Sequence, residues 1–78
     1  MSLSPHTALV KGDKGTLVVE LQEKLASLGY LTEVTGVFDN ATLEAVKNFQ
    51  RRNGIATTGN AGQQTQTALY GKDPVPAW

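Results

Sequence analysis

Cysteine is absent from this 78-residue chain, and histidine occurs once, as His6. Without cysteine there can be no disulfide, no thiolate nucleophile and no cysteine-ligated zinc site. One histidine cannot form a two-histidine metal site, and no nucleophile stands with a base and an orienting group in a recognisable pattern. The sequence therefore predicts a domain without a bound metal or cofactor, suited to an oxidising or a reducing compartment.

A surplus of charge of either sign is also missing. Seven lysines and arginines balance seven aspartates and glutamates, and the pI is about 6.5. Proteins that bind nucleic acid need basic groups to meet the phosphates, so we expect no nucleic-acid partner. No stretch approaches the roughly 20 apolar residues of a membrane span, and residues 1–10 lack the apolar segment of a signal peptide. We therefore expect no membrane insertion and no signal peptide.

The residues that are present indicate one small folded domain. Hydrophobic residues make up 40% of the chain and charged residues 18%, which is typical of globular proteins. A domain of this length buries only about 60% of the surface of its unfolded chain, so a deep catalytic cleft would be costly. Length and composition favour a binding module over an enzyme.

Apolar residues recur every three or four positions in three segments, as in amphipathic helices. The spacing predicts helices over residues 16–28, 40–53 and 63–70. Each segment is followed by a glycine, a residue common where helices end. These glycines are Gly29, Gly54 and Gly71. The remaining apolar pairs are too short for a sheet, so the sequence predicts an all-α fold.

One pattern occurs twice, over residues 36–46 and 59–69: a glycine, a turn residue, a threonine, an alanine and an aliphatic residue at matching positions. The first glycine of each copy permits a positive φ. The turn residue, Asp39 in one copy and Gly62 in the other, suits the N-cap of the following helix. We therefore predict a compact three-helix bundle built from a duplicated loop–helix repeat.

The two ends of the chain lack helical periodicity. We expect residues 1–9 to form a flexible N-terminal segment, residues 10–71 the three-helix domain, and residues 72–78 a Pro-rich linker or tail. The tail would lead to a further domain after Trp78, or Trp78 would pack back on the domain.

Several short motifs follow one another in a fixed order. They are Gly12-Asp13-Lys14-Gly15, Leu21-Gln22, Leu28-Gly29-Tyr30, Gly36-Val37-Phe38, Phe49-Gln50, Gly54-Ile55 and Ala68-Leu69. This set spans about residues 10–70 and resembles the peptidoglycan-binding domain of bacterial and phage cell-wall hydrolases. The resemblance implies a three-helix bundle with a repeated loop–helix element, in agreement with the periodicity.

The sequence departs from the usual family pattern at a few positions. Thr35 and Thr58 replace the aspartate of two Asp-Gly turns. Asp39 stands where a glycine follows the family phenylalanine, and Gln66 replaces an aromatic residue. Asp39 still suits a helix cap, so the fold prediction is unaffected. A ligand contact made by turn aspartates in other members would be altered here.

The candidate ligand-binding residues are polar or aromatic side chains, most of them in the two repeat loops. They are Tyr30, Phe38, Asp39, Asn40, Thr42, Arg51, Asn60, Gln63 and Gln64. Muropeptides offer amides, hydroxyls and carboxylates, which such side chains and free helix N–H groups can bind in a shallow groove between the loops. The alternative is that each residue is only a helix cap or a solvated turn.

Three further features have a structural interpretation as well as a functional one. We interpret the amides of Gln22 and Gln50 as partners of loop backbone groups rather than of ligand. Tyr30 is interpreted first as a core-packing ring with a surface hydroxyl, and second as a platform for a sugar. Arg51 and Arg52, with Lys47, form a basic edge on the second predicted helix. We interpret this edge first as a solvated helix face. This edge would also suit stem-peptide carboxylates or anionic wall polymers, whereas zero net charge disfavours DNA.

The resemblance implies a noncatalytic module that binds peptidoglycan, through its glycan strand or its stem peptide, and anchors a lytic enzyme linked covalently after Trp78. Such a module acts at the bacterial cell wall, outside the cytoplasm, in a phage lysin or as an excised domain. Two alternatives stay open. One is an interaction or regulatory domain that packs on its own enzyme or in a phage or cell-wall assembly. The other is a residual catalytic domain, although no acidic residue lies in an apolar run that would raise its pKa.

Overall fold

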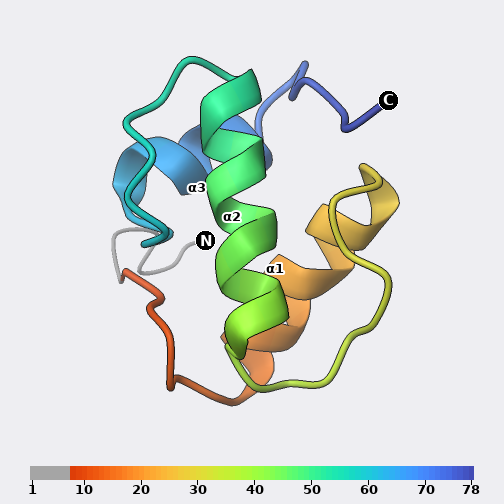
Figure 1. The fold of residues 1–78 in the computed structure, drawn as a ribbon, viewed down its shortest axis with the longest axis vertical. Coiled ribbons are helices and arrows are strands. Elements are labelled where there is room, and N and C mark those ends of the chain that lie inside the picture. Colours follow the sequence, from red (N-terminus) through yellow and green to blue (C-terminus); the bar gives the residue numbers. More distant parts are fainter. Residues whose placement is uncertain (1–7) are drawn as a thin grey trace.

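Three helices joined by long ordered loops make up the computed structural model, which describes residues 8–78 (Figure 1). The helices are α1 (Thr16–Ser27), α2 (Asn40–Arg52) and α3 (Gln63–Leu69). The all-α prediction is confirmed, and each helix ends one residue before its predicted boundary. Most of the predicted flexible segment 1–9, with His6, lies outside the described residues. No helix within residues 8–78 has the length and apolar character needed to cross a bilayer.

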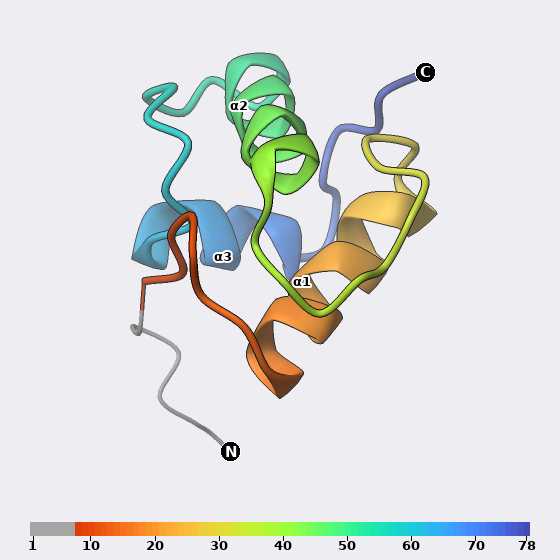
Figure 2. The ribbon, with the colours of Figure 1, turned by 60° about the horizontal axis from the view of Figure 1, so that its bottom comes forward.

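Helix α2 lies across α1 and α3 in both views of the ribbon (Figures 1 and 2). Buried apolar side chains from the three helices and the connecting loops fill the space between them. They are Leu9, Val18, Leu21, Leu25, Phe38, Ala45, Val46, Phe49, Ala61 and Leu69. The backbone of Leu9 pairs with that of Ala61 through two hydrogen bonds of 3.1 and 2.9 Å. The folded domain therefore includes Leu9, one residue before the expected start of the domain.

Glycine ends α1 and α2 in the same way. Gly29 has a φ of 86°, and its N–H donates to the carbonyl of Ala26 at 3.0 Å. The N–H of the next residue, Tyr30, donates to the carbonyl of Leu25 at 2.9 Å. Gly54, with a φ of 71°, ends α2 with the equivalent bonds. These left-handed residues satisfy the last carbonyls of each helix and turn the chain sharply toward the next loop.

A buried glutamine fixes the loop of the first repeat. The side-chain oxygen of Gln22 accepts hydrogen bonds from the N–H groups of Thr35 and Gly36, at 3.0 and 2.8 Å. Its side-chain nitrogen donates to the carbonyl of Val37 at 2.9 Å and to Thr42 Oγ1 at 2.8 Å. The amide therefore joins α1 to the loop and to the first turn of α2.

Gln50 does the same in the second repeat. Its oxygen accepts from the N–H groups of Thr58 and Gly59, at 3.0 and 2.9 Å, and its nitrogen donates to the carbonyl of Asn60 at 2.9 Å and to Thr65 Oγ1 at 3.0 Å. The matching partners confirm the duplicated repeat and the interpretation of both glutamines. The copies differ in length, because thirteen positions separate the first glutamine from its threonine N–H and eight separate the second.

The C-terminal tail folds back past the end of α2 to the end of α1, as the blue end of the ribbon shows (Figures 1 and 2). Val75 exchanges two hydrogen bonds with the side chain of Asn53, at 2.9 and 3.3 Å. Ala77 donates its N–H to the carbonyl of Leu28 at 2.8 Å. The tail therefore lies along the domain, and the side chain of Trp78 at its end is 75% exposed.

Candidate functional site

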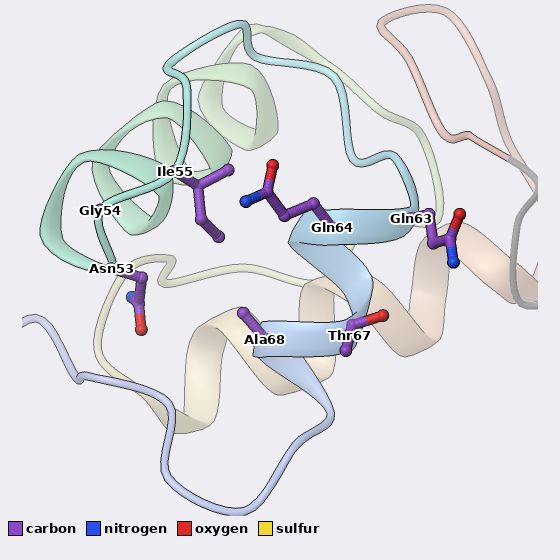
Figure 3. A pocket seen from close by; sticks show the side chains of 7 residues that line it. All are labelled: Asn53, Gly54, Ile55, Gln63, Gln64, Thr67 and Ala68. Carbon is purple, nitrogen blue, oxygen red and sulfur yellow. The ribbon is translucent and has the colours of Figure 1, made fainter.

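A groove lies between the loop that follows α2 and the exposed side of α3 (Figure 3). Its volume is about 490 Å³, which falls in the range of small-molecule sites in proteins. The lining residues are Asn53, Gly54, Ile55, Gln63, Gln64, Thr67 and Ala68. We call this the α3 groove.

Local structure explains why these residues meet. The N–H of Ile55 donates to the carbonyl of Gln50 at 2.8 Å, which turns the chain back toward α3 directly after Gly54. Ile55 and Ala68 pack partly on the core and give the groove an apolar floor. The side chain of Gln64 extends from α3 toward Ile55 (Figure 3). The groove is therefore held by the backbone carbonyl of Gln50, the residue whose side-chain amide fixes the second repeat.

A smaller hollow of about 230 Å³ extends the α3 groove along the loop to Thr58 and Asn60. It shares Ile55, Gln63 and Gln64 with the larger groove. No residue lining either hollow carries a charge. Amides, hydroxyls and an apolar floor can bind a neutral ligand that combines hydrogen-bonding groups with apolar faces. Within residues 8–78 there is no cluster of three or more His, Cys, Asp or Glu side chains suited to a metal ion.

The structure divides the predicted site residues into three groups. Asn60, Gln63 and Gln64 come together in the α3 groove and its extension, as their shared loop suggested. Tyr30 and Arg51 line a different groove, which lies between α2, the residues that follow α1 and the C-terminal tail. These two sets of residues thus line separate grooves, and both grooves adjoin the C-terminal end of α2.

The third group surrounds the N-terminus of α2 and lines neither groove. Phe38 is 1% exposed and Thr42 is fully buried, so neither side chain presents a surface to ligand. A direct ligand contact by these two residues is inconsistent with that burial. Asn40 is exposed in the first turn, and Asp39 caps the helix by accepting from the N–H of Thr42 at 3.0 Å. Hydrogen bonds from the backbone and hydroxyl of Thr42 hold the pKa of Asp39 below its ordinary value.

The second groove, which we call the basic groove, has a volume of about 320 Å³. It is lined by Gly29, Tyr30, Asn48, Arg51, Arg52 and Ala77. The Tyr30 ring stands edge-on to Phe49 with centroids 5.6 Å apart, and its hydroxyl donates to the carbonyl of Val75. Burial raises the pKa of Tyr30, and the nearby charge of Arg52 opposes that rise. The interpretation of Tyr30 as a core-packing ring is confirmed.

Sequence reasoning missed several lining residues. Asn53, Thr67 and Ala68 line the α3 groove from positions that look like ordinary helix surface or helix end. Ile55 carried a signal, because a hydrophobic residue directly after a helix-ending glycine commonly packs against the end of its own helix. Ala77 carried none, since it reaches the basic groove only through the fold of the tail.

Comparisons with known proteins agree with this architecture. The family model of the peptidoglycan binding domain matches residues 14–69. N-acetylmuramoyl-L-alanine amidase CwlL of Bacillus licheniformis is 38% identical over 71 residues, which cover 87% of this chain and 20% of that protein. The spore cortex-lytic enzyme of Bacillus cereus is 40% identical over 65 residues, which cover 82% of this chain and 25% of that protein. The chain thus spans a quarter or less of these relatives.

Solved structures show the same fold. The N-terminal domain of SleB superposes with a TM-score of 0.80 at 37% identity, over 82% of this chain and 89% of that one. The Burkholderia AP3 phage endolysin superposes with a TM-score of 0.80 at 33% identity, over 87% of this chain and 27% of that one. The family model matches from before α1 to the end of α3. This chain therefore belongs to the peptidoglycan-binding domain family and corresponds to the noncatalytic part of larger cell-wall hydrolases.

Proposed function

We propose that this domain anchors an attached lytic enzyme at the bacterial cell wall by binding the glycan strand of peptidoglycan in the α3 groove. The observation that carries the proposal is the extent of the match. More than four fifths of this chain aligns with 20–25% of two wall-lytic enzymes. A lytic domain joined after Trp78 would perform the chemistry outside the cytoplasm. The anchor would raise the effective concentration of that domain at its bonds.

The lining of the α3 groove supports the ligand class. N-acetylated sugars present acetamido groups, hydroxyls and apolar ring faces. The amides of Asn53, Gln63 and Gln64 and the hydroxyl of Thr67 can bind the polar groups, and Ile55 can contact a ring face. Since no charge lines the groove, the affinity of this contact for the glycan should change little with salt.

Co-sedimentation of the 78-residue domain with washed peptidoglycan sacculi tests the proposal, with chitin and cellulose as controls and at low and high salt. We expect pelleting with sacculi that persists at high salt. Failure to pellet under either condition would refute the anchor. An increase in the activity of the full-length enzyme on small soluble substrates after deletion of the domain would instead favour the regulatory alternative.

Variants locate the face that binds. Thr67→Ala and Gln64→Ala should each weaken binding to sacculi about two- to ten-fold, the effect of losing one hydrogen bond. Thr32→Ala is the matched control, because Thr32 is an exposed threonine outside both grooves. Equal binding by the Thr67 and Thr32 variants would remove the α3 groove from the proposal, even if the wild-type domain pellets.

A further inference from the structure

The basic groove brings two positive charges together without a negative one in its lining. Arg51 donates from Nη1 to Asn48 Oδ1 at 2.7 Å, and Arg52 donates from Nε to the carbonyl of Pro76 at 2.9 Å. In the part of the chain that the structure describes, neither guanidinium has a carboxylate partner. Both arginines are therefore oriented by neutral groups that leave their charge uncompensated.

The docked tail completes this groove. Ala77 forms part of its wall and is held by the hydrogen bond from its N–H to the carbonyl of Leu28. The ring of Trp78 lies so close to Gly29 that a Cβ at that position would come within 2.8 Å of it. Glycine at position 29 thus serves the tail as well as the end of α1. The pairing of Arg52 with Pro76 means that the same tail also orients a cation of the groove.

We infer that the basic groove, completed by the tail, binds a carboxylate of the peptidoglycan stem peptide. The inference rests on the proposed function. A guanidinium presents parallel N–H donors that match the two oxygens of a carboxylate, and a planar pair of this kind is stronger than a neutral hydrogen bond. Stem peptides carry free carboxylates, whereas the sugars of the glycan strand present neutral groups to the α3 groove.

The two grooves are placed to serve one polymer. Asn53 lines the α3 groove, and its side chain holds Val75 of the tail that walls the basic groove. The preceding residues of α2, Arg51 and Arg52, line the basic groove. A glycan strand in one groove and its own stem peptide in the other would therefore contact the same end of α2.

Titration of the ¹⁵N-labelled domain with N-acetyl-D-alanine tests the site directly, because this probe carries one carboxylate and no sugar. We expect shifts in the Nε–H signal of Arg52 and in the backbone signals of Tyr30 and Ala77. N-acetyl-D-alaninamide, which lacks the charge, should produce none. Shifts of equal size with inorganic phosphate, or with the amide, would overturn the assignment of a carboxylate.

Two variants separate the parts of the inference. Arg51→Gln with Arg52→Gln should weaken binding of the probe about five-fold or more. Lys11→Gln with Lys14→Gln removes the same charge from an exposed loop outside the groove and should leave binding unchanged. Ala77→Pro keeps both arginines but removes the N–H that holds the tail, so it should also weaken binding. Unchanged binding in the arginine variant overturns the site, and unchanged binding in Ala77→Pro overturns the part assigned to the tail.

Failure of this inference and failure of the proposed function are distinguishable. Loss of the probe's effect with retained pelleting of sacculi refutes the carboxylate site alone. Loss of pelleting with a retained carboxylate effect refutes the anchor and leaves a site for a different carboxylate ligand, which overturns the assignment to the stem peptide.

Discussion

Replacement of Gln50 with methionine tests how much one buried amide contributes to the stability of the domain. Gln50 is 1% exposed, and its side chain makes hydrogen bonds to four different residues of the second repeat. Methionine has nearly the same length and fills the same space, so the change removes the amide without opening a large cavity. The free energy of unfolding then reports the polar network rather than the packing.

The expected loss follows from the groups left without a partner. The N–H of Gly59 and the hydroxyl of Thr65 belong to buried residues and lose the amide, whereas the carbonyl of Asn60 still accepts from the N–H of Gly62 at 3.0 Å. Thr58 is exposed, so its N–H can turn to water. A buried unsatisfied group costs about 1–3 kcal/mol, which gives a destabilisation of about 3–5 kcal/mol when part of it is relieved by hydration. A domain of this length is stable by only about 4–12 kcal/mol, so the variant should lose about a quarter or more of its free energy of unfolding.

Urea unfolding followed by circular dichroism at 222 nm measures this loss. Gln63→Met is the matched control, because Gln63 is exposed on α3 and its replacement should change the free energy of unfolding by less than about 0.5 kcal/mol. Should Gln50→Met not fold at all, Thr65→Val removes one bond of the same network and should cost about 1 kcal/mol. A loss below about 1 kcal/mol in Gln50→Met would refute the reasoning, since water would then satisfy the loop as well as the amide does.

Three further predictions concern the helix ends and the tail. Because the pKa of Asp39 is lowered in the folded state, its carboxylate stabilises the domain above the unfolded-state pKa. The Tm advantage of the wild type over Asp39→Asn should therefore be present at pH 6 and shrink as the pH falls below about 4, as measured by thermal unfolding. Gly29→Ala should destabilise the domain more than Gly54→Ala. Both glycines have a positive φ, but only at Gly29 would the added Cβ also meet the ring of Trp78. Equal urea midpoints of the two variants would contradict this. Asn53→Ala removes the side chain that holds the tail and should lower the fluorescence anisotropy of the single tryptophan; an unchanged anisotropy would show that the other contacts suffice.

Local patterns predicted the helices and the repeat because these depend on neighbours a few residues apart. The spacing of apolar residues set the helices, and the order of the motifs placed Gln22 and Gln50 in equivalent positions. The burial of Phe38 and Thr42 agrees with the same local patterns, because Thr42 lies one turn before Ala45 and Val46 on the buried face of α2. Their choice as ligand-binding candidates followed instead from their place beside polar residues of the first repeat loop.

The basic groove could not be predicted from such patterns. Its wall depends on hydrogen bonds between residues far apart in the chain: 24 positions separate Arg52 from Pro76, and 45 separate Tyr30 from Val75. The tail has no periodicity, so its density of proline indicated an extended segment but not the surface against which that segment lies. A charge pattern on one helix could suggest a site there, yet it could not show that the tail completes it.

The α3 groove lies in the shorter of the two repeats. Both repeats hold their loop by the same amide geometry, but eight positions rather than thirteen separate Gln50 from Thr58. In the second repeat α2 ends at Arg52, two residues after its glutamine, whereas α1 continues for more than another turn beyond Gln22. Ile55 follows Gly54 as Tyr30 follows Gly29 in the first repeat, and it lines the groove beside α3. The duplication thus supplies a stable scaffold, and the loop and helix of the shorter second repeat line the α3 groove.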